Sequence, residues 1–364
     1  MRVIVAGAGV AGLAAARGLL AAGHDVEVYE EAPGPRTAGG SVTLWPGSTA
    51  ILDELGIGYA NLGWRLETME SWTEDGRRLF TVDLTSAERR YGHPCVHVAR
   101  RELVAALAGD LPVVYGAGVE HAVPERAEAR LAGGRTVRGD VLVGADGRRS
   151  AVRRALWGDD PATLSGWVTW QGFTTAPTSL TGARRAVMIA GRRELCGLIP
   201  AGEGRLLWWF DVQASPGGPF WKDDPDIVRR LRERFGGWAD PVPTVLETMN
   251  EIDFFPHHRH TIPAIWGRGP TTLAGDAAHT MPPTMAQGAN QALEDAWLLT
   301  RSVGGDLRAY ERARARIARR PALLASSEVT NRQRSYAGLF PDWMATRLHT
   351  ASLRRFSSYL LTAS

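Results

Sequence analysis

A carboxylate, two adjacent prolines and a glycine-led helix start lie close together between residues 271 and 290, and this combination could bind an anion. Asp276 follows a short apolar run that is typical of a buried strand, so its carboxylate can accept hydrogen bonds from a sugar hydroxyl. Pro282 and Pro283 have no N–H to donate, which prevents the chain from entering a helix at once. Helical spacing begins near Gly288, and the first amides of a helix are unpaired and partly positive. The segment therefore predicts an anion site, although a plain buried connection has the same pattern.

The N-terminus carries a second pattern of this kind. An apolar strand precedes the run 7–12, GAGVAG, and a helical pattern and a further strand follow it. Gly7 permits a tight turn, Gly9 lets the backbone approach a pyrophosphate, and Gly12 allows close packing of the helix. Glu30 ends the further strand, where a carboxylate can hold the hydroxyls of an adenosine ribose. Because an acid there disfavours a 2′-phosphate, the pattern predicts FAD or NAD rather than NADP.

Two further segments could approach a bound dinucleotide. The glycine pair Gly39-Gly40 could pass close beneath a flat ring, with Trp45 beside it, or it could close the core as an ordinary loop. The run 146–148, DGR, follows an apolar strand and precedes a helix. This third strand–turn–helix unit is either part of the site or a connection with a capping serine or aspartate.

Together, the segments 7–12, 144–153 and 275–290 resemble in order and spacing the single-component FAD-dependent aromatic hydroxylases, the group A monooxygenases of the p-hydroxybenzoate and salicylate hydroxylase type. The resemblance implies tightly but non-covalently bound FAD. The residues that it assigns to the cofactor are Gly7, Gly9, Ala11, Gly12, Glu30, Glu31, Arg36, Gly40, Ser41, Arg100, Asp146, Gly147, Arg148, Gly275, Asp276, Pro283, Gly288, Ala289 and Asn290. This chain departs from the family at Ala286, where glycine is usual, and the change costs backbone freedom.

The order of the patterns predicts an α/β fold with three parts. We expect a Rossmann-type FAD-binding domain like that of p-hydroxybenzoate hydroxylase, a β-sheet substrate domain and C-terminal helices. The expected FAD-binding domain is discontinuous and comprises residues 1–63, 92–163 and 256–303; the substrate domain comprises 64–91 and 164–255, and the helical region 304–364.

The expected substrate sheet is rich in tryptophan, which favours a flat and largely apolar substrate, although core packing explains most of these residues. Adjacent Trp208 and Trp209 point to opposite faces of their strand, so only one can face the substrate. Many salicylate- and urate-type relatives carry W-R-G on the first strand of this sheet, where this chain has Gln171 in place of arginine. An anionic carboxylate substrate is then less favourable, and Gln171 can hydrogen-bond a neutral carbonyl or hydroxyl. The expected substrate contacts are Trp45, Trp170, Gln171, Trp208 and Trp209.

The resemblance places Gln171 and Pro283 nearest the reaction, with Pro283 beside the oxygen-reactive carbon of the flavin. It implies that NAD(P)H, bound transiently near Asp146 and Arg148, reduces FAD. Oxygen then forms a C4a-hydroperoxyflavin, which hydroxylates an aromatic substrate in a dry cavity. A catalytic base is not identified. One histidine of the run 257–260 could relay a proton, but a polar connector explains the run more simply, and its spacing does not predict a metal site.

Composition narrows the remaining classes. The 364 residues include no apolar run long enough to span a membrane, and the two cysteines form neither a disulfide framework nor a metal motif, which favours a cytoplasmic protein. We expect no nucleic-acid or membrane partner, and a monomer or homodimer that binds a small aromatic substrate and O2. Epoxidation, Baeyer–Villiger-type oxidation and oxidase chemistry on the same scaffold stay open. A plain NAD-dependent dehydrogenase and a non-catalytic FAD-binding protein are the alternatives from other classes.

Overall fold

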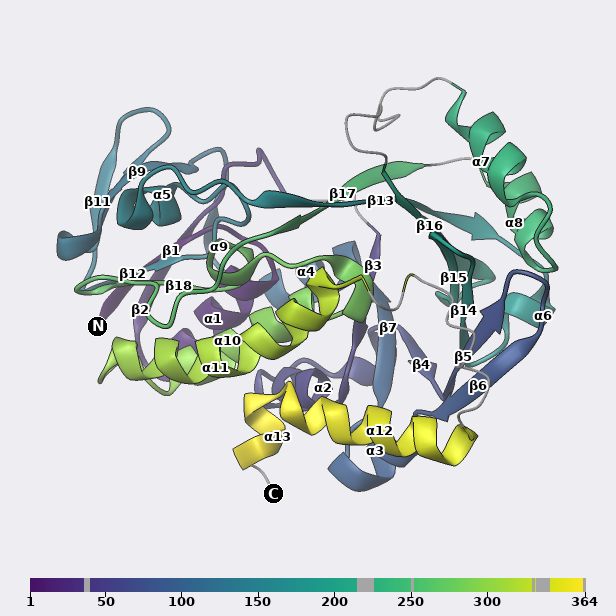
Figure 1. The fold of residues 1–364 in the computed structure, drawn as a ribbon. Coiled ribbons are helices and arrows are strands. Elements are labelled where there is room, and N and C mark those ends of the chain that lie inside the picture. The colour runs from purple at the N-terminus through teal and green to yellow at the C-terminus, as the bar shows by residue number, and fades with distance from the viewer. Residues whose placement is uncertain (36–39, 215–225, 250–251, 329–330, 332–340, 363–364) are drawn as a thin grey trace.

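The computed structural model describes residues 1–35, 40–214, 226–249, 252–328, 331 and 341–362, and two main sheets organise it (Figure 1). The first sheet has five parallel strands in the order β18-β12-β1-β2-β8. These strands are β1 (Arg2–Ala6), β2 (Asp25–Tyr29), β8 (Val113–Val114), β12 (Val141–Gly144) and β18 (Thr271–Leu273). Strands β1 and β12 are short runs of buried residues, as a parallel sheet with covered faces requires.

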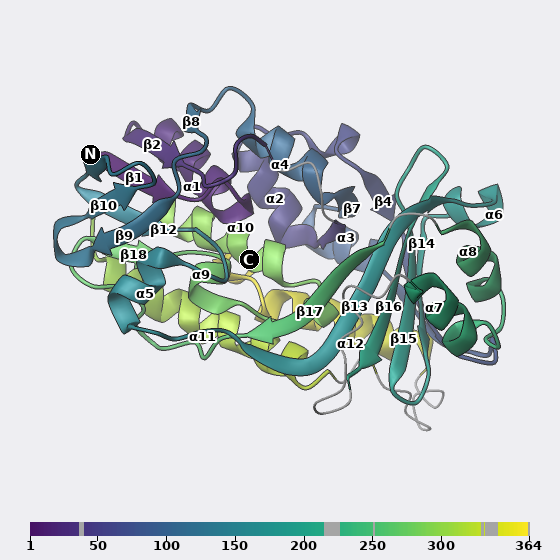
Figure 2. The same ribbon diagram turned by 90° about the horizontal axis from the view of Figure 1, so that it is seen from above.

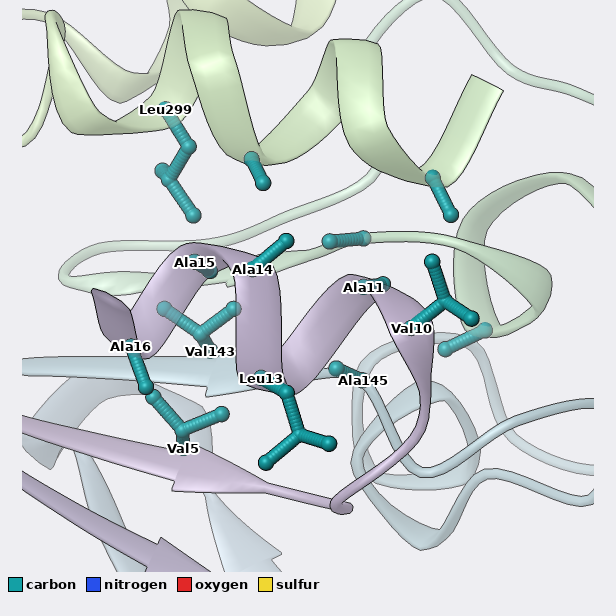
Figure 3. Packing of buried hydrophobic residues seen from close by; sticks show 14 of the residues in the cluster. Val5, Val10, Ala11, Leu13, Ala14, Ala15, Ala16, Val143, Ala145 and Leu299 are labelled. Carbon is teal, nitrogen blue, oxygen red and sulfur yellow. The ribbon is translucent and has the colours of Figure 1, made fainter. Parts of the chain in front are cut away.

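Helix α1 (Val10–Ala21) lies between this sheet and helix α10 (Gly288–Thr300). Figure 3 shows residues of α1 packed between Val143 of the sheet and Leu299 of α10. The two helices run in the same direction. A Cβ at Gly18 would lie 2.4 Å from Thr300 Oγ1 at their C-terminal ends, whereas Ala11 and Ala292 both lie beside Gly275 near their first turns. The two helix starts therefore lie at the same edge of the sheet.

The second sheet has seven strands in the order β17-β13-β16-β15-β14-β5-β6. Its strands are β5 (Thr68–Thr73), β6 (Arg78–Asp83), β13 (Thr163–Thr175), β14 (Arg185–Ala190), β15 (Glu194–Pro200), β16 (Arg205–Gln213) and β17 (Asp253–Arg259). Helices α7 (Ile227–Phe235) and α8 (Val242–Thr248) cover the face that is turned away from the first sheet (Figure 2). The expected fold class is thus confirmed, whereas the exact domain bounds stay a prediction.

Smaller elements join the two sheets or cover them. A third sheet has the order β3-β7-β4, with β3 (Ser41–Leu44), β4 (Trp64–Leu66) and β7 (Cys95–Ala99), and a fourth has β9 (Val119–Val123), β10 (Glu128–Leu131) and β11 (Thr136–Arg138). The other elements are α2 (Pro46–Glu54), η1 (Tyr59–Asn61), α3 (Thr85–Tyr91), α4 (Arg100–Ala108), η2 (Pro124–Arg126), α5 (Ala151–Trp157), α6 (Thr178–Thr181), α9 (Asp276–His279), η3 (Pro283–Met285), α11 (Leu307–Ser326), α12 (Asp342–Arg355) and α13 (Ser358–Thr362). Among the helices in the described part of the chain, none combines the length and apolarity that crossing a membrane requires.

A buried ion cluster ties the turn after β18 to α10 and α11. Asp295 accepts a hydrogen bond from Gly275 N at 2.7 Å and another from Arg314 Nε at 2.7 Å. His279 Nε2 lies 2.6 Å from the same carboxylate. Burial alone would raise the pKa of Asp295, but His279 and Arg314 hold it below its ordinary value. All three side chains are fully buried, and the Asp295 carboxylate and the Arg314 guanidinium offset each other's charge.

Replacing Arg314 with methionine should destabilise the protein by about 3–5 kcal/mol, because Asp295 would be left buried without its cation. Urea unfolding followed by circular dichroism measures the change. Arg316→Met provides the matched control, since Arg316 is exposed on the same helix. A loss below about 1 kcal/mol for Arg314→Met would show that the cluster contributes no more than a surface pair.

Candidate functional site

Three glycines in different surroundings lie in the loop between β1 and α1 and in the first turn of α1. A Cβ at Gly7 would lie 2.4 Å from Ala145 O, and one at Gly12 would lie 1.9 Å from Gly7 O. Gly7 also has a φ of +99°, which favours glycine. A Cβ at Gly9 would meet nothing within 4 Å, so the backbone is open to a ligand there. This arrangement fits a pyrophosphate, because free amides at a helix start bind anions.

Three loops that are far apart in the sequence meet at this point. The first touches the second through Gly7 and Ala145. The first also touches the third, because a Cβ at Gly275 would lie 2.7 Å from the Cβ of Ala11. The loops follow β1, β12 and β18, which are neighbours in the first sheet. Ligands bind outside the carboxyl ends of strands in open parallel sheets, so the convergence marks a ligand site.

Two of the expected carboxylates lie beside these loops, one buried and hydrogen-bonded and the other exposed. Glu30 is 6% exposed, and it accepts hydrogen bonds from Ala8 N at 2.7 Å and Ala32 N at 3.1 Å. It therefore lies at the end of β2 against the glycine loop, where a ribose-binding acid is expected. Asp276 begins α9 and is exposed. The neighbour of Glu30, Glu31, packs against the backbone at Gly118.

Asp146 has a structural role as a helix cap. Its Oδ2 accepts hydrogen bonds from Ala151 N at 2.7 Å and Val152 N at 3.3 Å, and Ser150 donates to its Oδ1. Burial raises the pKa of Asp146. The Asp146 carboxylate therefore caps α5, and its contact with the cofactor stays a prediction. Gly147 has a φ of +76° and open space around it, so the turn itself can still approach a ligand.

Arg148 adds positive charge next to the exposed carboxylate of Asp276. Burial and the neighbouring Arg149 lower the pKa of Arg148, whereas Asp276 opposes that effect. The same two arginines and burial lower the pKa of His258. Positive charge from Arg148 and Arg149 and negative charge from Asp276 thus lie together at this edge of the site.

Helix α10 begins at Gly288, as predicted, with no side-chain cap and no acidic residue in its first turn. Asn290 fixes this helix start, because its Oδ1 accepts from Trp45 N at 2.9 Å and its Nδ2 donates to Thr43 O at 2.8 Å. Ala286 adopts a φ of +48°, the left-handed conformation that a glycine would adopt without strain. The free first amides of α10 can stabilise an anion.

Two other expected cofactor contacts, Pro283 and Ala289, lie in the segment that leads into α10 and in its first turn. Pro283 begins η3 and is exposed, and Ala289 in the first turn of α10 is half-buried. Arg36 lies outside the described residues. Whether each of these side chains touches the cofactor stays a prediction.

Gly40, immediately before β3, lies against Gln171 of the second sheet. A Cβ at Gly40 would lie 2.5 Å from Gln171 Nε2, and Gly40 O accepts a hydrogen bond from Arg100 N at 3.0 Å. Ser41 Oγ lies 2.7 Å from His97 Nε2. Burial lowers the pKa of His97 to about 3, so the imidazole is neutral at physiological pH. This histidine was not expected from the sequence.

The second sheet presents different residues on its two faces. Gln171 and Trp209 are opposite each other in register on β13 and β16, on the face next to Gly40. We call this the inner face. Trp170 and Trp208 point the other way and are at most 2% exposed in the core that α7 and α8 cover. The structure therefore does not bring these two tryptophans to the site, which corrects their assignment as substrate contacts. Trp209 is the one of the adjacent pair that faces inward.

The inner face also carries a buried polar cluster. Thr169 Oγ1 lies 2.7 Å from His257 Nε2 and donates a hydrogen bond to Asp211. His257 Nδ1 lies 2.9 Å from Glu328 Oε1, and Asn331 Nδ2 donates to Asp211 Oδ2 at 3.1 Å. Burial raises the pKa of Asp211 to about 6, although His257 and Thr169 oppose the shift. No group of metal-binding side chains occurs within the described residues.

Asp211→Asn should remove a fall in stability that the wild type shows between about pH 4 and pH 6. The folded-state pKa of about 6 exceeds the ordinary value, so the folded protein binds more protons in this window and loses stability as the pH rises. The amide copies the uncharged carboxyl group and should raise stability at pH 7 by up to about 3 kcal/mol. Urea unfolding from pH 4 to pH 8 tests this, with exposed Asp159→Asn as the control. Parallel pH profiles for Asp211→Asn and wild type would contradict it.

Comparisons with known proteins agree with this geometry. Residues 1–320 match the family model described as the FAD binding domain. Aurachin C monooxygenase/isomerase of Stigmatella aurantiaca is 32% identical over 312 residues, which cover 83% of this chain and 80% of that protein. The 3-amino-4-hydroxybenzoate 2-monooxygenase PtnB3 of Streptomyces platensis is 33% identical over 333 residues, which cover 86% and 84%. The structure of Klebsiella pneumoniae HpxO complexed with FAD and uric acid has a TM-score of 0.83 and 26% identity, and covers 99% of this chain and 94% of that chain.

The family match extends over all three converging loops, whereas a plain NAD-dependent dehydrogenase would account for the first loop alone. The cofactor is therefore FAD, and the open backbone at Gly9 together with the uncapped start of α10 fits its pyrophosphate and its ring. The chain belongs to the FAD-dependent aromatic monooxygenases, the group A flavoprotein hydroxylases.

Proposed function

We propose that this monooxygenase hydroxylates a flat, uncharged aromatic compound, with NAD(P)H as the reductant and O2 as the oxygen source. The observation that carries the proposal is the position of Gln171, which lies against Gly40 and beside Trp209. An amide that faces the cofactor can orient a carbonyl or hydroxyl group, and an indole beside it can cover an aromatic ring. The names of the relatives, which describe oxygenation of 3-amino-4-hydroxybenzoate and of urate, support an aromatic substrate.

The charges on the inner face support an uncharged substrate. Arg205 points to this face from β16, and it is already paired with Glu102 at 3.3 Å and Glu203 at 3.5 Å. Gln171 occupies the position where an arginine would offer a fixed positive charge. A substrate carboxylate would therefore lose its water of hydration without gaining a free cation among these residues.

FAD, when bound, supplies the redox chemistry and the activation of oxygen, and the protein positions it. Gly9 would admit the pyrophosphate, Glu30 and Asp276 would bind sugar hydroxyls, and the first amides of α10 would stabilise negative charge on the ring. Gln171 would hold the polar group of the substrate, and Trp209 would exclude water from the ring. Pro283 at the start of η3 would face the reacting edge of the cofactor without offering it a proton.

Asp276→Ala should weaken FAD binding about tenfold or more, because a hydrogen bond from a sugar hydroxyl to a carboxylate would be lost. Ultrafiltration of the purified yellow protein, followed by absorbance of the released flavin, measures retention. Asp159→Ala removes an exposed carboxylate from the segment after α5 and should leave retention unchanged. Equal retention by both variants would remove Asp276 from the cofactor site.

The reaction is tested with FAD-loaded protein, NADH or NADPH, labelled oxygen and a panel of phenols and polycyclic aromatic compounds, some with and some without a carboxylate. Mass spectrometry should find one labelled oxygen atom in the product of at least one uncharged compound, and weaker conversion of its carboxylated analogue. Gln171→Arg should shift that preference toward the carboxylated analogue, since it adds a cation to the inner face. Consumption of NAD(P)H that yields hydrogen peroxide and no labelled product would contradict the proposal.

A further inference from the structure

One row of residues crosses the inner face of the second sheet from Gln171 on β13 to Phe80 on β6, the far edge strand. The strand registers place Gln171 opposite Trp209, Trp209 opposite Gly197, and Gly197 opposite Met188. Met188 is level with Ser71 on β5, which in turn is opposite Phe80 on β6. Residues that are in register on neighbouring strands share a face, so these side chains form a continuous strip. We call Trp209, Gly197, Met188 and Phe80 the apolar row.

Gly197 allows the indole of Trp209 to lie across the row. A Cβ at Gly197 would lie 2.0 Å from Cζ2 of Trp209, which leaves no room for any side chain. The ring therefore covers β15 and extends from Gln171 toward Met188. A flat aromatic surface of this kind can guide an apolar group along the sheet.

The apolar row is incompletely buried, in contrast to the other face of the same strands. Trp209, Met188 and Phe80 are each partly exposed, although they pack against one hydrophobic cluster. On the opposite face, Trp208 and Phe210 are fully buried beneath α7 and α8. Apolar side chains that are left partly exposed beside a ligand site are available to contact a ligand.

The far end of the row is closed by α12. Ala345 of this helix packs against the same cluster as Met188 and Phe80. Two side chains of α12 bind backbone amides of β6, since Asp342 Oδ1 accepts from Thr81 N at 2.8 Å and Thr346 Oγ1 accepts from Asp83 N at 3.0 Å. Helix α12 therefore lies against the end of the row, and the small side chain of Ala345 packs on the same cluster.

Along β13 from Gln171, at right angles to the apolar row, the inner face is filled. Thr169 lies two residues along β13, and its hydroxyl is engaged by His257 and Asp211 within the buried polar cluster. Glu328 closes this cluster from the end of α11. A substrate held at Gln171 can thus extend over the apolar row, but not over the polar cluster.

We propose that the apolar row is a binding subsite for an apolar arm of the substrate, so that the enzyme takes an aromatic ring that carries an alkyl chain or a further fused ring directed from Gln171 toward Ala345. The inference rests on the proposed function for the position of the ring. It adds the substrate class, namely a phenol or related heterocycle with an extended apolar substituent, and it names Ala345 as the residue that limits the length of that substituent.

The test measures binding of phenol, 4-butylphenol, 4-octylphenol and 4-dodecylphenol to the oxidised, FAD-loaded protein by titration calorimetry, without turnover. Burial of each methylene should tighten binding about fourfold, over at least the first three methylenes. Ala345→Phe should leave the affinity for phenol within about twofold of wild type and remove the gain for the longer chains. Ala351→Phe, at an exposed position of the same helix, should keep the wild-type gain in affinity for each added methylene, which we call the slope.

Circular dichroism shows whether each variant folds. If Ala345→Phe does not fold, Met188→Gln, which makes the middle of the row polar, tests the slope instead. Equal affinities along the wild-type series, no binding of any alkylphenol, or a wild-type slope in the folded variants would each overturn the subsite. A steep slope without labelled product would contradict only the proposed hydroxylation. Labelled product without a slope would contradict only the subsite.

Discussion

Backbone contacts that leave no room for a side chain hold the cofactor site together. An added Cβ would lie closer than 3 Å to the loop after β12 at Gly7, and closer than 3 Å to Ala11 of α1 at Gly275, and both glycines have a positive φ. The three loops can meet only because these positions are glycine. Their meeting places the first turn of α1 and the first turn of α10 at one edge of the sheet, so that one elongated anionic cofactor can reach both helix starts.

Helix α10 contacts the third loop, α11 and the third sheet through side chains at its buried side and at its start. Within its buried side, Asp295 holds Gly275 and Arg314, which fixes the third loop and α11 to one helix. At its start, Asn290 holds the backbone of Trp45 and Thr43, which fixes the third sheet. The surface that binds the cofactor ring is therefore positioned by the same helix that orients the elements next to the substrate. A shift of α10 would change both sites together.

The parts of this arrangement that could be predicted from the sequence are local. Glycine spacing after a strand, as in the run 7–12, and the uncapped helix start at Gly288 are set by backbone chemistry within a few residues. The alternation at Trp208 and Trp209 showed that only one could face the substrate, but which one depends on the packing of α7 and α8 on the sheet.

The contacts that could not be predicted join residues far apart in the sequence. The polar cluster takes Thr169 and Asp211 from neighbouring strands, His257 from a third strand and Glu328 from the end of α11. No single segment carries a signal for that meeting. In the same way, the sequence around Asp146 matches a cofactor motif, and only the tertiary structure shows that the oxygens of Asp146 cap α5.

Hydrogen exchange followed by mass spectrometry, on deflavinated protein with and without added FAD, tests most directly whether one cofactor spans the three loops. Amides in peptides covering residues 7–13, 144–150 and 286–291 should all become protected with the same dependence on FAD concentration, because one molecule contacts all three. Protection of the first peptide alone, with the exchange of residues 286–291 unchanged, would contradict the arrangement described for this enzyme.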